Sequence, residues 1–363
     1  MLLIRQISPQ LNRYAQRFYR AAPPLETMNQ VLKEQLLHVK RDAKITIRSD
    51  IYMKICSTDV ISGEGTALCA ELNGGPEQNQ SADMKITVSE DKHDVEIVCS
   101  KLTEDSDRHC SIAVPILADL NIETKDAVSV QNMYNREVKI KAQKNIRTKD
   151  IKSADIQLLS VSGDILCEGM FLGDLTVVET KGSGNITLDK PQGNLLECKT
   201  EAGNITTNSC YVDSSKFTTD NGSMNLKNVH KKSQVFVNKQ GDLNVSGFHG
   251  NLFVRTNGGS MNLQLSEIND ENIIMVKNID ESVVNIADSI EELSFIEITA
   301  SEVKLDSPLS HLSDGLSEDK SFFRMSTERD NCNKLKICAN GIVKLGKLSW
   351  AESMKIAMGM KKD

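Results

Sequence analysis

Gly184-Asn185-Ile186-Thr187-Leu188 belongs to a series of similar segments in the middle of this 363-residue chain. Gly203-Asn204-Ile205-Thr206-Thr207 and Gly222-Ser223-Met224-Asn225-Leu226 follow it at intervals of 19 residues. Self-similarity at a short fixed period is the signature of a repeat architecture, in which each unit buries its apolar side against its neighbours. Further copies begin at Gly163, Gly241 and Gly259, and weaker ones at Asp126 and Asn145.

Apolar and polar residues alternate within each segment, which places one set inside a strand and the other outside. The glycine before each strand favours a tight turn because it accepts a positive φ. The following Asp, Asn or Ser can bond to nearby backbone, and stacked coils would set these side chains into a ladder. We predict two inward columns, one of Ile165, Ile186, Ile205, Met224, Leu243 and Met261, the other of Cys167, Leu188, Thr207, Leu226, Val245 and Leu263.

A second strand fills the interval between successive segments, for example at residues 173–177 and 250–254. Each coil of about 19 residues therefore carries two short strands. One buried Ile or Leu contributes ~1.5–3 kcal/mol, so a coil with few of them depends on stacked neighbours. The sequence predicts an all-β fold, a single-stack β-solenoid (parallel β-helix-like) of two-strand coils with β-rich N-terminal and C-terminal caps.

The segments SGDI, GSGNITL, EAGNITT, NGSMNL and QGDLNV resemble the putative adhesin family, a domain of unknown function. The lead-in Val114-Pro115 and Leu120-Asn121-Ile122-Glu123-Thr124 adds to the resemblance. It covers residues 112–306 and, more loosely, the C-terminal NGIVKLGKLSW. The resemblance implies a β-solenoid and supplies no catalytic residues. The whole layout, with its basic leader, also resembles an uncharacterised animal protein family.

Four parts are expected: a leader at 1–24, a helix and β-rich cap at 25–111, the solenoid at 112–306, and a polar loop with a strand cap at 307–363. Alternation predicts flanking strands at 44–48, 84–88, 95–98, 273–276 and 283–286, and a final strand pair within 335–348. Loops are expected at 73–76 and 307–330, and Trp350 is expected to cover the last coil. Apolar residues at helical spacing predict the N-terminal helix, namely Leu25, Met28, Leu32, Leu36 and Val39.

The first 25 residues contain no Asp or Glu but four arginines, Arg5, Arg13, Arg17 and Arg20, among apolar residues at roughly helical spacing. This pattern is typical of a mitochondrial transit peptide, cleaved near residues 19–22, and predicts a matrix location; the alternative is an ordinary basic arm. The nine cysteines form no C-x-x-C pair, and the odd count favours reduced thiols. No apolar run reaches the ~18 residues of a membrane span.

The net charge of −7 argues against nucleic acid as a partner. No Walker A, Rossmann or G-x-S-x-G motif occurs, so we assign no catalytic, cofactor-binding or metal-binding residue. The Asp/Asn ladder lacks the tight nonapeptide spacing of calcium-binding β-rolls. A polysaccharide-cleaving enzyme needs grouped carboxylates, whereas Asp174, Asp189 and Asp242 are scattered turn residues.

Two further patterns have ordinary explanations. His230, Lys231 and Lys232 form the densest basic spot, which is either a solvated loop or a partner contact. Five asparagines match the N-x-Ser/Thr glycan acceptor pattern. One is Asn79, and the other four arise from the repeat itself: Asn185, Asn204, Asn221 and Asn244.

Three functions remain open. The sequence favours a non-catalytic mitochondrial scaffold that binds an unknown protein partner through a solenoid flank. The alternatives are a surface or secreted adhesin-type glycan-binding protein and a β-helix enzyme that acts on carbohydrate. An export signal would favour the glycan-binding adhesin. A cleft of grouped carboxylates would favour the carbohydrate-acting enzyme.

Overall fold

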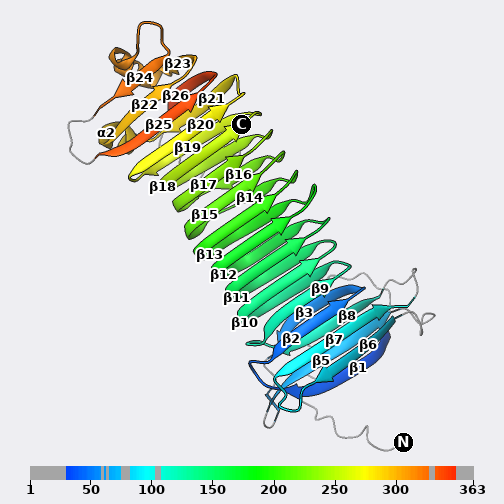
Figure 1. Ribbon diagram of the computed structural model, residues 1–363. Coiled ribbons are helices and arrows are strands. Elements are labelled where there is room, and N and C mark those ends of the chain that lie inside the picture. Colours follow the sequence, from blue (N-terminus) through cyan, green and yellow to red (C-terminus); the bar gives the residue numbers. More distant parts are fainter. Residues whose placement is uncertain are drawn as a thin grey trace, which may run out of the picture.

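The computed structural model describes residues 30–58, 61–62, 65–74, 82–102, 108–326 and 332–348. Its strands lie side by side in one elongated stack (Figure 1). Helical structure in these residues is limited to α2 (Asp288–Leu293) and the 3₁₀ element η2 (Ser307–Gly315). The predicted all-β class is therefore confirmed. No helix among the described residues is long and apolar enough to cross a membrane. The expected leader at 1–24 lies outside the described residues.

Long parallel strands form the centre of the stack. They are β10 (Val128–Ala142), β11 (Ile146–Ser160), β12 (Ile165–Thr180) and β13 (Ile186–Thr200). Pairing joins equivalent positions of successive coils, as in Val128 with Ile146 and Ile165 with Ile186. Two short strands per coil, as predicted, follow at β14 (Ile205–Thr207) with β15 (Tyr211–Thr219) and at β16 (Met224–Lys227) with β17 (His230–Val237). The longer strands, including β18 (Leu243–Asn257), run through the bend without interruption.

The stack has two faces, because each long strand pairs through its first part with one set of neighbours and through its last part with another. We call the face that contains the Gly-Asx segments the ladder face. Its strand order is β1 (Gln30–Val39), β5 (Gly65–Gly74), β8 (His109–Pro115), β3 (Tyr52–Thr58), β10 to β14, β16, β18, β19 (Met261–Ile268), β21 (Glu281–Ile286), β26 (Ile342–Lys347) and β23 (Glu302–Leu305).

The opposite face is built in the same way from the second half of each coil. Its order is β6 (Ala82–Val88), β7 (Asp94–Lys101), β2 (Lys44–Ser49), β9 (Asp119–Thr124), β10 to β13, β15, β17, β18, β20 (Glu271–Lys277), β25 (Asn333–Ala339), β22 (Ser294–Thr299) and β24 (Phe322–Met325). The short β4 (Ile61–Ser62) pairs with β5. These bounds confirm the strands predicted in both flanks.

The core lies between the two faces. Side chains from the ladder face meet those of the opposite face, such as Leu196 and Phe217, in one continuous apolar cluster. Every member of the first predicted inward column is buried, from Ile165 to Met261. The second column is buried too, including Thr207 and Cys167. The period-2 pattern therefore located the core correctly throughout the repeat.

Gly259 has the predicted positive φ, but other glycines of the series are required for a different reason. Gly184, Gly203 and Gly222 lie outside the left-handed region, so a positive φ does not select them. A Cβ at Gly203 would lie 1.8 Å from the carbonyl oxygen of Gly184, and one at Gly222 would lie 1.7 Å from that of Gly203. Close approach of successive coils therefore excludes any side chain at this corner.

The N-terminal helix expected within 25–39 is wrong where the structure describes it, because residues 30–39 form strand β1. This strand pairs antiparallel with β5, and that pairing overrides the helical spacing of the apolar residues. Leu36 is exposed, whereas Val39 is buried and Leu37 packs against the core. The alternation of a strand thus describes this segment better than one face of a helix.

Both ends of the stack contain a strand pair inserted one coil inward. At the N-terminal end, β2 and β3 lie between β7–β8 and β9–β10. At the C-terminal end, β25 and β26 lie between β20–β21 and β22–β23. The predicted final strand pair therefore exists but is not the outermost coil. The strands of the expected N-terminal cap continue both faces of the stack. The expected boundary between residues 111 and 112 falls inside β8.

Part of the polar loop expected at 307–330 is structured. η2 begins with Pro308 in its first turn and buries Leu309. β24 pairs antiparallel with β22 and buries Phe323. These two apolar side chains explain why the segment is structured, because both pack against the core. Trp350 lies outside the described residues.

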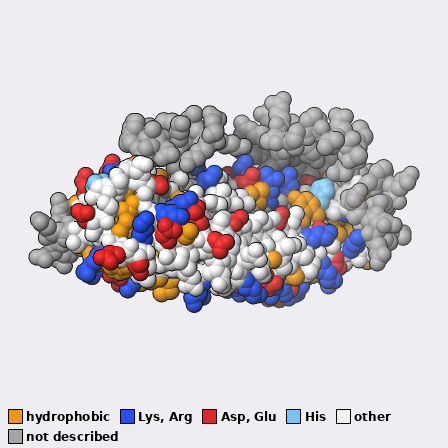
Figure 2. All heavy atoms as spheres, turned by 90° about the horizontal axis from the view of Figure 1, so that it is seen from above, with side chains coloured by type: hydrophobic (Ala, Val, Ile, Leu, Met, Phe, Trp, Pro, Cys, Tyr) orange, Lys and Arg blue, Asp and Glu red, His pale blue; other side chains and the backbone are white. Residues whose placement is uncertain are grey.

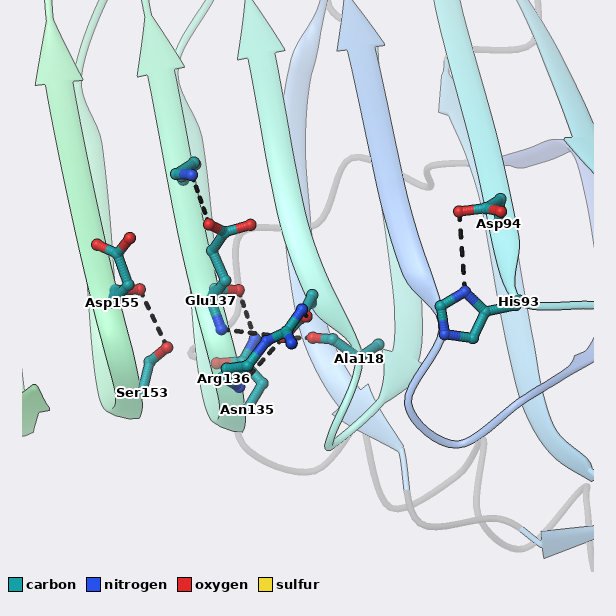
Figure 3. Close-up of polar contacts among 10 residues, drawn as sticks. His93, Asp94, Ala118, Asn135, Arg136, Glu137, Ser153 and Asp155 are labelled. Atoms are coloured by element: carbon teal, nitrogen blue, oxygen red, sulfur yellow. Dashed lines mark hydrogen bonds and ion pairs between the residues drawn. The ribbon is translucent and has the colours of Figure 1, made fainter.

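Polar contacts join the N-terminal end to the first regular coil (Figure 3). The Asn135 amide donates to the carbonyl oxygen of Ala118 at 2.7 Å. Arg136 forms an ion pair with Asp119, whose carboxylate also accepts the backbone N–H groups of Arg136 and Glu137 at 3.1 and 2.9 Å. Asp119 therefore joins the start of β9 to the middle of β10.

Candidate functional site

A ladder of polar side chains runs along the corner that precedes the ladder face. Asn185 Oδ1 accepts the backbone N–H of Asn204 at 2.9 Å, and Asn204 Oδ1 accepts that of Ser223 at 2.9 Å. Each side chain thus bonds to the equivalent residue of the next coil, which confirms the predicted ladder. The remaining steps join Asn145 to Asp164, Asp164 to Asn185, Ser223 to Asp242, and Asp242 to Ser260.

An open groove of about 630 Å³ lies beside this ladder, and we call it the ladder groove. One wall is the ladder itself, and the floor is the outward column of the adjoining strands. Tyr52 of β3 and Arg147 of β11 are among its lining residues. The other lining residues are Ala127, Val128, Ser129, Asn145, Ile146, Asp164, Ile165, Leu166, Asn185, Thr187, Asn204 and Thr206.

The groove offers hydrogen-bonding groups and one aromatic ring. Tyr52 is exposed, and the Arg147 guanidinium is held by Glu168 at 2.7 Å. The amides and hydroxyls of Asn185, Thr187 and Asn204 supply both donors and acceptors. The residues that line the groove form no nucleophile–base pair of the kind that acyl transfer requires. The arrangement is therefore suited to binding a polar ligand.

A second cluster lies on the other corner of the coil, between β15 and β19. The rings of Tyr211 and His230 stack with centroids 4.6 Å apart, and those of His230 and His249 stack at 4.9 Å. Glu267 continues the column, with its carboxylate 3.8 Å from His249 Nδ1. A hollow of about 260 Å³ adjoins this histidine stack and is also lined by Lys231, Gly250 and Asn269.

The histidine stack occupies the basic spot noted in the sequence. His230, Lys231 and Lys232 begin strand β17, so the predicted loop is wrong, although Lys231 and Lys232 are exposed to solvent as expected. Burial, together with the neighbouring His249, lowers the pKa of His230, so its ring is neutral at pH 7. Sequence reasoning missed Tyr211 and His249. Their 19-residue spacing from His230 was the available signal.

Two groups of residues bear on metal binding. The rings of His230 and His249 are nearly parallel, with an interplanar angle of 5°, so their nitrogen lone pairs, which lie in the ring planes, do not converge on one ion between the rings. Donor atoms of Glu34, Cys69 and Glu71 lie within 4.8 Å of one another on β1 and β5. Burial and the two carboxylates raise the pKa of Cys69 to about 11. This thiol is protonated at neutral pH, so we do not assign a metal site to the cluster.

The structure does not bring the scattered carboxylates together. Asp174 accepts from Asn194, Asp189 from Asn208, and Asp242 from Ser260, each in the next coil. They act as separate rungs between coils. Acidic and basic side chains are interspersed over the described part of the face in Figure 2. All nine cysteines are free thiols.

Comparison with known proteins shows that part of this chain is similar to one protein family. The profile of the Toastrack DUF4097 family matches residues 172–278, which lie within the regular coils. This part of the chain is similar to that family. No curated protein matches the chain, so the resemblance to an animal family gains no support.

Solved structures of bacterial proteins are also similar to this chain. A putative adhesin from Bacteroides fragilis is 15% identical over 65% of this chain and 95% of its own, with a TM-score of 0.37. A putative adhesin from Parabacteroides distasonis is 9% identical over 86% and 96%, with a TM-score of 0.36. A putative lipid binding protein from the same organism is 9% identical over 87% and 96%, with a TM-score of 0.28. At these TM-scores the superpositions carry no argument about function.

Proposed function

We propose that this protein is a non-catalytic recognition protein that binds an extended polyhydroxylated ligand, a glycan, along the ladder groove. The observation that carries the proposal is the groove of about 630 Å³ lined by amides, hydroxyls, Arg147 and the Tyr52 ring. Sugars present many hydroxyl groups and a flat apolar side. A tyrosine, with its apolar ring and polar hydroxyl, suits such a surface.

Two features of the groove favour an extended ligand. The ladder hydrogen bonds hold Asp164, Asn185 and Asn204 in place before any ligand arrives, which reduces the entropy lost on binding. The same chemical groups also recur at every coil, about 4.8 Å apart. A linear chain of similar units matches such a repeating wall better than a compact molecule does.

The test is binding of the full-length protein to an array of immobilised oligosaccharides. Thr187→Arg places a long charged side chain in the groove and should abolish binding to any glycan that the wild type retains. Gln234→Arg makes a matching change on β17 of the opposite face and should leave binding unchanged. Equal loss in both variants, or no glycan bound by the folded wild type, would contradict the proposal.

A mitochondrial scaffold is the second candidate, and the acid-free, arginine-rich start of the chain supports it. The deciding measurement is the N-terminal residue of the cellular protein together with protease protection in isolated mitochondria. A protected chain that begins near residues 20–24 would favour the matrix scaffold. A chain in the secretory pathway would favour the glycan-binding function.

A further inference from the structure

An apolar patch lies on the outer surface of the opposite face, over the neighbouring strands β17, β18 and β20 (Figure 1). We call it the outer patch, and its members are Phe236 on β17, Phe253 and Arg255 on β18, and Ile273 and Met275 on β20. Each of these side chains alternates with buried neighbours along its strand, so all five point away from the core. Met275 is 39% exposed, and the ring centroids of Phe236 and Phe253 lie 5.7 Å apart.

The outer patch departs from the pattern of the coils that precede it. In the same two outward rows, the residues are Glu197 and Lys199 on β13, then Lys216 and Thr218 on β15. Lys216 forms an ion pair with Glu197 at 2.8 Å, and Lys199 forms one with Glu179 of β12 at 3.4 Å. The same coil therefore folds with polar side chains at these positions. Exposed apolar side chains that gather in one place mark an interaction surface.

Arg255 gives the outer patch a positive charge that has no counterpart. Its guanidinium carbon lies 5.2 Å from the centroid of the Phe236 ring. Within the described part of the chain, no carboxylate forms an ion pair with Arg255. Aromatic residues, Met and Arg are the residue types that protein interfaces favour. The guanidinium is therefore available to a carboxylate of a partner.

The size of the outer patch suits a polypeptide segment better than a lipid surface. Its three strands span roughly 10 Å, at about 4.8 Å between neighbours. The ion pair of Lys216 with Glu197 lies on one side, and on the other side Lys336, next to Ile273, pairs with Glu297 at 3.5 Å. A bilayer over the patch would also desolvate these charges, which is costly. An extended segment of roughly three or four residues covers the apolar side chains alone.

We propose that the outer patch binds a segment of a partner protein in which an aromatic or aliphatic side chain stands next to an Asp or Glu. The apolar side chain lies against Phe253, Ile273 and Met275, and the carboxylate pairs with Arg255. The site is on the face opposite the ladder groove and shares no residue with it. It is therefore independent of the glycan-binding proposal, and either one can fail without the other.

The test selects binders of the folded full-length protein from a phage-displayed library of random peptides. We expect enriched sequences that combine an aromatic or aliphatic residue with a neighbouring Asp or Glu. A synthetic peptide of the enriched sequence should lose affinity about tenfold with Phe253→Lys and with Met275→Lys. Leu159→Lys is the matched control, because Leu159 points outward on the same face from β11, beside Glu179 and outside the patch. It should leave the affinity unchanged.

Arg255→Gln tests the charge, and it keeps the test decisive if a lysine variant fails to fold, since this side chain is exposed. The variant should weaken binding of the peptide about fivefold and reduce the dependence of its affinity on salt. Replacing the carboxylate of the peptide by its amide should have the same effect on the wild type and none on Arg255→Gln. This double-mutant comparison isolates the contact between the two charges.

Peptides that bind Phe253→Lys, Leu159→Lys and the wild type equally would overturn the proposal, as would a library that yields no enriched sequence. Vesicles of phosphatidylcholine and phosphatidylglycerol provide a further arm. If the wild type binds them and Phe253→Lys does not, the patch belongs to a lipid surface instead. A dimer in analytical ultracentrifugation that Phe253→Lys dissociates would assign the patch to a second copy of this chain.

Discussion

The middle of the stack and its N-terminal end reach the same two-faced architecture by different means. In the middle, successive coils follow one another in the chain and repeat the same residue types at the same positions, from β10 to β19. At the N-terminal end, neighbouring strands come from distant parts of the chain, as β2 does between β7 and β9. Repetition stabilises the first region, and specific single contacts stabilise the second.

Gly222→Ala should produce the largest effect, because it breaks the close stacking on which the middle depends. The added Cβ would lie 1.7 Å from the Gly203 carbonyl oxygen, so two coils must separate. We expect a loss of about 3 kcal/mol or more in the free energy of unfolding, measured in urea. Gly182→Ala is the matched control. Its Cβ meets nothing within 4 Å, and its positive φ alone costs about 1 kcal/mol.

Asp119→Ala tests the single contacts of the N-terminal end. The carboxylate accepts two backbone N–H groups and pairs with Arg136, and its removal leaves these donors without a partner. We expect a loss of about 2 kcal/mol in the same assay. Arg136→Ala removes only an exposed guanidinium and should cost less than about 1 kcal/mol. Equal losses would mean that the ion pair, and not the two backbone hydrogen bonds, accounts for the effect.

Asn204→Ala removes one rung of the ladder and should have a smaller effect. The Ser223 N–H loses its acceptor, which we expect to cost about 1 kcal/mol. Asn204→Asp keeps an acceptor oxygen at the same place and should retain most of the stability. If the two variants behave alike, the ladder bond is not the cause. Urea unfolding of both variants beside the wild type gives the answer.

The smallest effect concerns pH at the histidine stack. The pKa of His230 is lower in the folded state than in the unfolded chain, so the unfolded state binds a proton first as pH falls. The contribution of His230 to the free energy of unfolding is therefore fully present above about pH 6.5 and decreases as the pH falls below that value. We expect a loss below about 1 kcal/mol between pH 7 and pH 5, since solvent screens the site. His230→Gln should flatten that slope, and His93→Gln, far from the stack, should not.

The contrast between the two regions also explains what sequence could predict. The inward columns, such as Ile205 and Leu226, follow from period-2 alternation because each coil contacts a copy of itself. The column of glycines was predicted for the same reason. The need for glycine there comes from a neighbouring carbonyl oxygen, and only the stacked coils of the structure show that oxygen. The histidine stack was recognisable in part, since His230 stood out, while Tyr211 and His249 needed the register.

The N-terminal end resisted prediction because its pairings are not local. Nothing in the sequence of β1 indicates that β5 will be its partner, so helical spacing and strand alternation were both compatible with it. The inserted pairs β2–β3 and β25–β26 have no local signature either. In the candidate groove, the ladder amides were predicted from the repeat, whereas Tyr52 enters from a strand outside it.

The inserted pairs give the molecule a mechanical property. In a simple coil stack, a force applied at one end detaches the terminal layer first and then each following layer in turn. Here the last strands of the described chain, β25 and β26, lie between two other layers, each bonded on both sides. A pull on the C-terminal end must therefore shear two interfaces at once before any layer is freed. At the other end β1 is an edge strand of the described chain and pairs with β5, so a pull there reaches β2–β3 only after β1 is released.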